Sequence, residues 1–163
     1  MARQAQLRIR GFSLIELVIV VVIIGIIGAI AIPRMSRGAA GAADSALVAD
    51  LAVLRNAVDL YQAEHGGKYP PLTGFADHMT QFSDVLGTAT NATKDDTADP
   101  PIVYGPYLRA LPTMKVGDNK GKSGVTGTAG TAGFGWVYDE DTGAITANTG
   151  TLKDDRGVLY TAY

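Results

Sequence analysis

The 163-residue chain contains no cysteine, only two histidines and a single tryptophan. Without cysteine no disulfide can hold the fold together and no thiol can serve as a nucleophile. The portion of the chain that folds in water must therefore be stabilised by packing or by a bound ion. His65 and His78 are not accompanied by a Gly-x-Ser-x-Gly segment, so nothing in the pattern indicates an enzyme.

Acidic residues are absent from the start of the chain, where Arg3, Arg8 and Arg10 precede a long apolar run. By the positive-inside rule this end stays in the cytoplasm and the C-terminal part crosses the membrane. Beyond the run the basic residues are scattered and do not form a stripe, so we expect no nucleic acid partner.

The apolar run extends from Phe12 to Ile32 and contains one carboxylate, Glu16. Its twenty-one residues would form a helix of roughly 31 Å, which matches the hydrocarbon thickness of a bilayer. A charge inside such a helix is costly, although less so near its end. The sequence therefore predicts a membrane anchor whose carboxylate needs a partner.

Cleavage of the chain after Gly11 would supply that partner. The new amine of Phe12 would carry a positive charge four residues, or about one helical turn, before Glu16. Within one chain the two groups can lie on the same face. Between packed chains, one subunit's amine can instead meet another's carboxylate, and the sequence leaves both pairings open.

A conventional secretory signal is the alternative interpretation, because Ala29-Ile30-Ala31 has the small-x-small pattern of a cleavage site. Cleavage there would release the rest of the chain as a soluble protein. The apolar run is longer than the usual length of roughly 7 to 15 residues and contains a carboxylate, which favours a retained helix.

Residues 33–65 are predicted to form an amphipathic helix that ends near Gly66, where two glycines and two prolines follow. Its apolar residues recur at spacings of four and three, namely Leu47, Leu51, Leu54, Val58 and Tyr61. Pro33 lies between the two helical stretches, with glycines on both sides. We expect one segmented helix that bends or locally melts between Gly25 and Gly41.

Residues 66–163 are predicted to form a globular head. Phe134 to Asp139 and Ala144 to Asn148 resemble strands, and the Asp- and Gly-containing turn between them predicts a β-hairpin. Residues 117–133 and 87–101 are expected to be surface loops. The predicted class is α+β, with the long helix packed on a small antiparallel sheet.

Two acidic groups can supply hard oxygen ligands to calcium: Asp139, Glu140 and Asp141, or Asp154 and Asp155. Such clusters are more often solvated turns. We therefore expect no cofactor and no metal site, with calcium as the alternative.

The segment Gly11-Phe12-Ser13-Leu14-Ile15-Glu16-Leu17, together with Gly25 and Ala31-Ile32-Pro33, resembles the class III signal and N-terminal helix of type IV prepilins and type II secretion pseudopilins. The resemblance implies a pilin fold and a leader of residues 1–11. It also implies that a membrane prepilin peptidase cuts between Gly11 and Phe12 and methylates Phe12. Glu16 would align an incoming subunit with the N-terminus of its neighbour.

The head is similar to that of the major pseudopilins of type II secretion, the protein G family. The similar segments are Tyr69-Pro70-Pro71, Gly105-Pro106-Tyr107-Leu108, Leu111-Pro112 and Gly135-Trp136-Val137-Tyr138. The absence of cysteine agrees, because many type IVa pilins close their C-terminal region with a disulfide. Residues 152–163 depart from that family, since they lack its Asp- and Gly-rich calcium loop.

These resemblances imply a non-enzymatic subunit of a type II secretion pseudopilus. Its partners would be further copies of itself, other pseudopilins, the prepilin peptidase, an inner-membrane assembly platform and a cytoplasmic ATPase. The subunit would cross the inner membrane once, with a cytoplasmic N-terminus and a periplasmic head and filament. A type IV pilin or minor pilin for adhesion, motility or DNA uptake is one alternative. A membrane-anchored binding protein that never polymerises is another, but it would have no use for Glu16.

Overall fold

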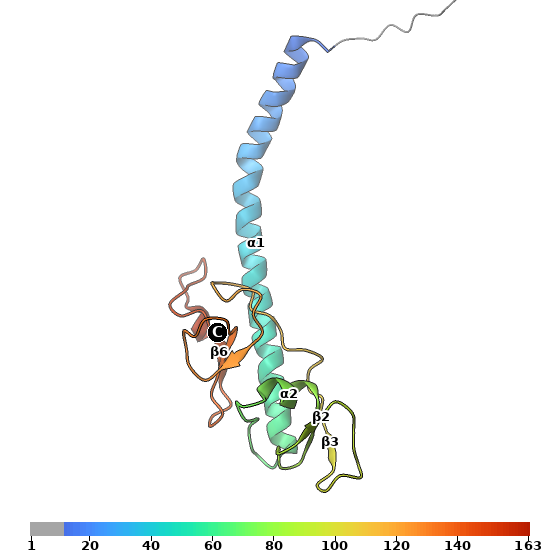
Figure 1. Cartoon of the computed structure of the whole chain (residues 1–163). Coiled ribbons are helices and arrows are strands. Elements are labelled where there is room, and N and C mark those ends of the chain that lie inside the picture. The colour runs from blue at the N-terminus through green and yellow to red at the C-terminus, as the bar shows by residue number, and fades with distance from the viewer. Residues whose placement is uncertain (1–11) are drawn as a thin grey trace, which may run out of the picture. The chain divides into compact units, whose positions relative to one another are not determined.

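The structure is a computed structural model that describes residues 12–163, apart from the side chains of residues 32–37. The predicted leader, including Gly11, lies outside the described residues. The described chain divides into two units, residues 12–39 and Ala40–Tyr163, which we treat separately. The helix α1, Leu14–Glu64, belongs to both units, and every strand belongs to the second. Figure 1 follows the chain from the start of α1, in blue, to the C-terminus, in red.

The helix α1 continues without interruption past Gly25 and Pro33. The predicted local melting is therefore wrong, while the predicted bend stays a prediction. A proline removes one backbone hydrogen bond, and the bonds before and after it suffice to keep the chain helical here. The side chain of Pro33 lies outside the described residues.

In the second unit, α1 buries the predicted apolar stripe. All five side chains are at most 1% exposed: Leu47, Leu51, Leu54, Val58 and Tyr61. The helix ends as expected, because Gly66 adopts a φ of 64° and the N–H of Gly67 donates to the carbonyl of Gln62 at 2.9 Å. This left-handed turn closes the helix C-terminus and favours glycine.

The short helix α2, Phe75–Thr80, precedes a three-stranded antiparallel sheet with the order β2-β1-β3. Its strands are β1 (Phe82–Asp84), β2 (Thr90–Asn91) and β3 (Ile102–Tyr104). Ser83 in β1 pairs with Thr90 on one side and Tyr104 on the other. The predicted loop of residues 87–101 thus contains one strand, too short for an alternating pattern to reveal.

The second sheet has the order β4-β5-β6, from Val125–Thr126, Trp136–Tyr138 and Ile145–Ala147. The antiparallel pairing of β5 and β6 confirms the predicted hairpin. Strand β4 instead runs parallel to β5, within the predicted loop of residues 117–133. The head therefore holds two small sheets, one of them mixed, and the expectation of a single antiparallel sheet is corrected. The α+β class is confirmed.

Strand β4 could not be predicted from its glycine-rich sequence, because it forms through backbone contacts with β5 and not through a pattern of side chains. The N–H groups of Gly135 and Trp136 both donate to the carbonyl of Gly124, at 2.9 and 3.1 Å. A Cβ atom on Gly135 would lie only 2.2 Å from the carbonyl oxygen of Lys122. The two segments approach closely only because residue 135 has no side chain. The chain ends in a 3₁₀ turn, η1, over Tyr160–Ala162.

We predict that Leu54→Ala lowers the free energy of unfolding of the head by about 2–5 kcal/mol, because it leaves a cavity in a packed core. Leu60→Ala is the matched control, since Leu60 lies on the same helix and is 50% exposed, whereas Leu54 is fully buried. Denaturant unfolding of the full chain in detergent, followed by the fluorescence of Trp136, measures both. Equal effects of the two substitutions would contradict the core described here.

Candidate functional site

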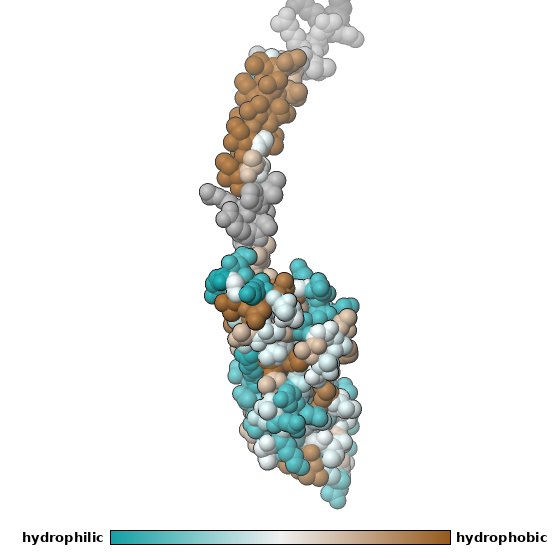
Figure 2. Space-filling model, turned by 90° about the vertical axis from the view of Figure 1, so that its left-hand side faces the viewer, coloured by the Kyte–Doolittle hydropathy of each residue, from teal (hydrophilic) through white to brown (hydrophobic). Residues whose placement is uncertain are grey.

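The N-terminal part of α1 presents a continuous apolar surface. The window Leu14–Ala31 has a mean hydropathy of 3.1, and none of its residues is buried. Figure 2 shows this stretch as an almost unbroken hydrophobic surface, whereas the head is largely polar. Among the residues that the structure describes, it is the one helix with the length and composition of a membrane span. The helix is consistent with single-pass membrane anchoring.

Glu16 lies in the first turn of α1 and closes the start of the helix. One of its carboxylate oxygens, Oε2, accepts a hydrogen bond from the backbone N–H of Ser13 at 2.9 Å. The carbonyl of Ser13 in turn accepts from the N–H of Leu17 at 3.2 Å. This is the carboxylate half of a capping box, and an anionic group is also favoured at the positive end of the helix dipole.

The sequence predicts a positively charged partner for Glu16 after cleavage, and this stays a prediction. Within its own chain the carboxylate already accepts one hydrogen bond. The signal was present in the spacing Ser13-x-x-Glu16, which is typical of a capping box. Phe12 precedes this cap directly and is 82% exposed. Cutting the chain before Phe12 would place its new amine one residue from the N–H that Glu16 already binds. Gly11, the other side of the predicted cut, lies outside the described residues.

In the head, two proline-containing segments, Tyr69-Pro70-Pro71 and Leu111-Pro112, contact β5. The hydroxyl of Tyr138 donates to the carbonyl of Pro70 at 2.9 Å, and Nε1 of Trp136 donates to the carbonyl of Pro112 at 2.9 Å. Both aromatic rings are at most 1% exposed. These segments therefore pack the head together and do not form a ligand platform.

A third such segment contacts the end of α1. The hydroxyl of Tyr107 donates to Oε2 of Glu64 at 2.6 Å. Burial, followed by this carboxylate, raises the pKa of Tyr107 well above its usual range. The tyrosine therefore stays protonated and available as a donor at all physiological pH values.

The acidic residues of the β5–β6 turn cap backbone groups. The carboxylate of Asp139 accepts from the N–H of Asp141 at 3.0 Å and from the hydroxyl of Thr142 at 2.8 Å, which lowers its pKa. Glu140 accepts from the N–H of Leu72 at 2.6 Å. Over residues 12–163, no three His, Asp or Glu side chains gather into a metal-binding group.

Asp154 organises the C-terminal loop in the same manner. Its carboxylate accepts from the N–H groups of Arg156 and Val158, at 2.9 and 2.8 Å, and from Nε of Arg156 at 2.7 Å. The hydroxyl of Tyr163 donates to it as well. These bonds, first that from Tyr163, hold the pKa of Asp154 well below its usual range. A guanidinium thus provides the positive charge beside this carboxylate.

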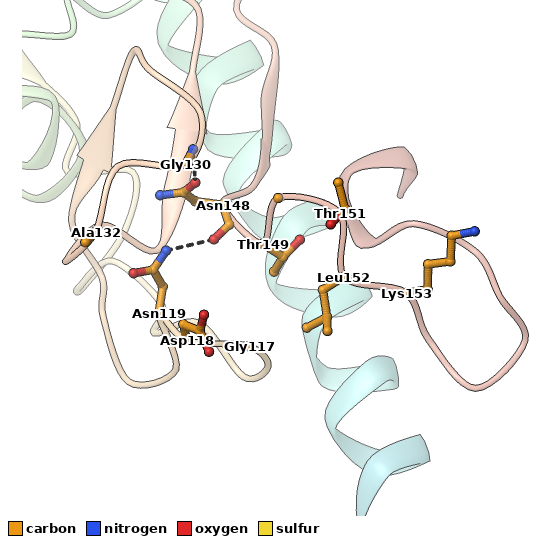
Figure 3. Close-up of a pocket in the computed structure, with 11 residues that line it drawn as sticks. Gly117, Asp118, Asn119, Gly130, Ala132, Asn148, Thr149, Thr151, Leu152 and Lys153 are labelled. Atoms are coloured by element: carbon orange, nitrogen blue, oxygen red, sulfur yellow. Dashed lines mark hydrogen bonds between the residues drawn. The ribbon is translucent and has the colours of Figure 1, made fainter.

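A cleft of about 580 Å³ opens between the loop that precedes β4 and the segment after β6 (Figure 3). Nδ2 of Asn119 donates to the carbonyl of Asn148 at 2.8 Å, and Oδ1 of Asn148 accepts from the N–H of Gly130 at 2.8 Å. Both amide side chains that line the cleft therefore hold its walls together, and they offer no arrangement for catalysis.

A buried polar cluster at the end of α1 was not found from the sequence. Nε2 of His65 lies 2.9 Å from Oγ of Ser83, the spacing of a base and a nucleophile. Ser83 is fully buried and His65 is 2% exposed, so no substrate can reach them. The pair is a structural hydrogen bond, and only its position in the fold could reveal it.

Comparison with known families gives one match. Residues 7–32 match the family described as the Prokaryotic N-terminal methylation motif. The match supports a type IV pilin-like, structural chain, and it indicates processing by a prepilin peptidase and pilus-like assembly. It includes the predicted cut, Phe12 and Glu16 but no part of the head. Comparisons with curated proteins and with solved structures found no match.

We predict that Asp154→Asn lowers the melting temperature of the head at pH 7. The low pKa of Asp154 in the folded state means that the ionised carboxylate stabilises the fold above the unfolded-state pKa of about 3.9. This stabilisation is lost as the pH falls below that value towards the folded-state pKa. The difference between variant and wild type should therefore shrink in acid.

Circular dichroism melts at several pH values measure this effect. Asp155→Asn is the matched control, because Asp155 is adjacent and exposed. A melting-temperature difference for Asp154→Asn that does not change between pH 7 and acid would show that the carboxylate charge plays no part.

Proposed function

We propose that the chain is the repeating structural subunit of a type II secretion pseudopilus, and that it polymerises after a prepilin peptidase cuts between Gly11 and Phe12. The observation that carries the proposal is the uncovered apolar surface of Leu14–Ala31, which has a single carboxylate at its start. Such a surface is stable in lipid or against similar helices, and not in water.

The same helix would serve in two environments. Before assembly it holds the subunit in the inner membrane, with the head on the periplasmic side. During assembly it leaves the lipid and packs against the helices of other copies, so its apolar side chains remain out of water throughout. The cytoplasmic ATPase and the membrane platform supply the energy, and the subunit supplies its shape and its contacts.

Glu16 has a distinct part in this scheme. It starts with a hydrogen bond from Ser13 in its own chain. Cleavage then adds a positive amine at Phe12, either of the same subunit or of a neighbour. A charge pair in an apolar environment favours one alignment over others, because a misplaced subunit would leave the carboxylate without a cation.

We favour secretion over a type IV pilus because of the resemblance of segments in the head to those of major pseudopilins. In this chain the segments are joined through β5, by the bonds of Tyr138 to Pro70 and of Trp136 to Pro112. They therefore pack together as one part of the head.

We expect mass spectrometry of the mature chain to find methylated Phe12 at the N-terminus. Prepilin-type processing removes residues 1–11 and modifies the new amine. An N-terminus at Ile32 would instead indicate conventional signal cleavage after Ala31, and it would end the proposal.

We further expect Glu16→Gln and Glu16→Ala to impair filament formation and secretion to a similar extent, while leaving membrane insertion and cleavage intact. Glutamine can still accept a hydrogen bond from Ser13, so it preserves the cap and removes only the charge. Glu16→Ala removes both.

The comparison separates the two roles of the carboxylate. If Glu16→Gln assembles like wild type and only Glu16→Ala fails, Glu16 acts as a helix cap and not as the partner of an amine. Filament formation is measured by shearing or cross-linking, and secretion by the cargo in the medium. Loss of motility or adhesion with normal secretion would favour a type IV pilin.

A further inference from the structure

A buried cluster of ionisable side chains joins the end of α1 to α2 and β1. Tyr61 lies in the last turns of α1, His65 directly follows the helix, His78 lies in α2 and Ser83 lies in β1. None of the four side chains is more than 7% exposed. The two histidines of the cluster are the only two in the chain.

The hydrogen bonds define the state of His65. Its Nδ1 lies 2.8 Å from the carbonyl oxygen of Tyr61, which can only accept, so Nδ1 carries the proton. Its Nε2 lies 2.9 Å from Oγ of Ser83 and, in the neutral ring, accepts from that hydroxyl. The ring also stacks on Tyr61, with centroids 3.6 Å apart and planes within 2°.

Tyr61 connects this histidine to the other. Its hydroxyl lies 3.4 Å from Nδ1 of His78, and the two rings meet edge to face at 5.7 Å. The same hydroxyl lies against Gly87 in the β1–β2 turn, where an added Cβ would be 2.3 Å away. Any displacement of Tyr61 therefore disturbs α2 and the first sheet together.

The charged groups that face the histidines are already engaged elsewhere. Asp84 of β1 accepts from the N–H and the hydroxyl of Thr88. Glu64 accepts from Tyr107, and Asp77 of α2 accepts from the side-chain amide of Gln81. Over residues 12–163, neither imidazole is hydrogen-bonded to a carboxylate. Tyr104 and Tyr107 complete the surroundings, with ring centroids 5.5 and 6.3 Å from that of His65.

These surroundings oppose a positive charge. Burial, and next the neighbouring His65, lower the pKa of His78, while Asp77 and Asp84 act in the opposite direction with smaller effect. A proton on either ring would place a cation in a nearly dry cluster, and protons on both would add repulsion across Tyr61.

The second sheet is fastened to α1 without histidine. The guanidinium of Arg55 donates to the carbonyl of Ile145 in β6 at 3.2 Å, and the hydroxyl of Tyr160 donates to Asp44. These contacts lie earlier along α1 than Tyr61.

We propose that Tyr61, His65 and His78 form an acid-sensitive latch, which releases the β2-β1-β3 sheet from the end of α1. The β4-β5-β6 sheet stays in place, and so does the start of α2, because Phe75 packs on Tyr138 of β5 with ring centroids 4.5 Å apart. The latch is independent of the proposed assembly role. In an open form the imidazole of His78 would regain the ordinary histidine pKa of about 6.5, whereas in the closed form burial lowers that pKa, so acid favours opening. Closure is complete above about pH 6.5 and weakens as the pH falls below it.

Hydrogen exchange of the full chain in detergent tests the proposal between pH 7.5 and 5, with rates corrected for the intrinsic effect of pH. If His78 is protonated only on opening, the opening constant rises about tenfold per pH unit below 6.5. We expect this loss of protection in β1 and β3, and a change of less than about twofold in β5 and β6. The imidazole NMR signal of His78 should titrate together with the loss of protection.

His78→Asn is the matched variant, because the asparagine side chain can place an acceptor near the position of Nδ1 and cannot titrate. It should keep the protection at pH 7.5 and reduce the pH dependence. Three results would each overturn the latch: equal loss of protection in both sheets, an imidazole of His78 that titrates near pH 6.5 while protection persists, or an unchanged pH dependence in folded His78→Asn. If His78→Asn is unprotected at pH 7.5, the wild-type exchange and NMR titration decide.

Discussion

The head depends on the burial of one narrow stripe of α1. Leu47, Leu51, Leu54, Val58 and Tyr61 follow a spacing of four and three residues, which keeps them on one face of the helix, and all are removed from water. Without cysteine, no covalent bond supports this contact. The strands are only two or three residues long and could not form stable sheets alone. They persist because the stripe gives them a surface to pack on.

The two units of the chain place opposite demands on the same helix. Around the stripe the helix is conventionally amphipathic and acquires its partner by folding. Over Leu14–Ala31 it is apolar on all sides and has no buried residue, so folding of a single chain supplies no partner. The partner must come from outside the subunit, whether lipid or other helices. One unbroken helix thus has a buried apolar stripe in the head and an uncovered apolar surface near its N-terminus.

A feature could be predicted from the sequence when the residues that determine it lie close together along the chain. The stripe and the β5–β6 hairpin were predicted because their periodicity and turn residues lie within a short segment. Strands β2 and β4 were missed because two residues carry no period and their pairing comes from distant backbone. The bond between His65 and Ser83 joins residues from different elements, so no local pattern could indicate it. The capping box at Ser13 is a local pattern, Ser13-x-x-Glu16, so the sequence alone can indicate it.

That capping box satisfies one oxygen of Glu16 within its own chain. The bond from Ser13 uses Oε2 only, and a carboxylate accepts several hydrogen bonds, so pairing with an amine would add to the cap and need not replace it. The net free energy of such a pair would be small, since desolvation offsets most of the attraction between buried charges. In the proposed assembly the driving force would then come from the apolar surface, which is large but has little directionality. A charge pair between subunits would supply what that surface lacks, because it would form only when one subunit's N-terminus meets the carboxylate in a single register. If the apolar surface supplies the attraction and the charge pair supplies the register, subunits could slide against one another during assembly and stop only where the charges meet.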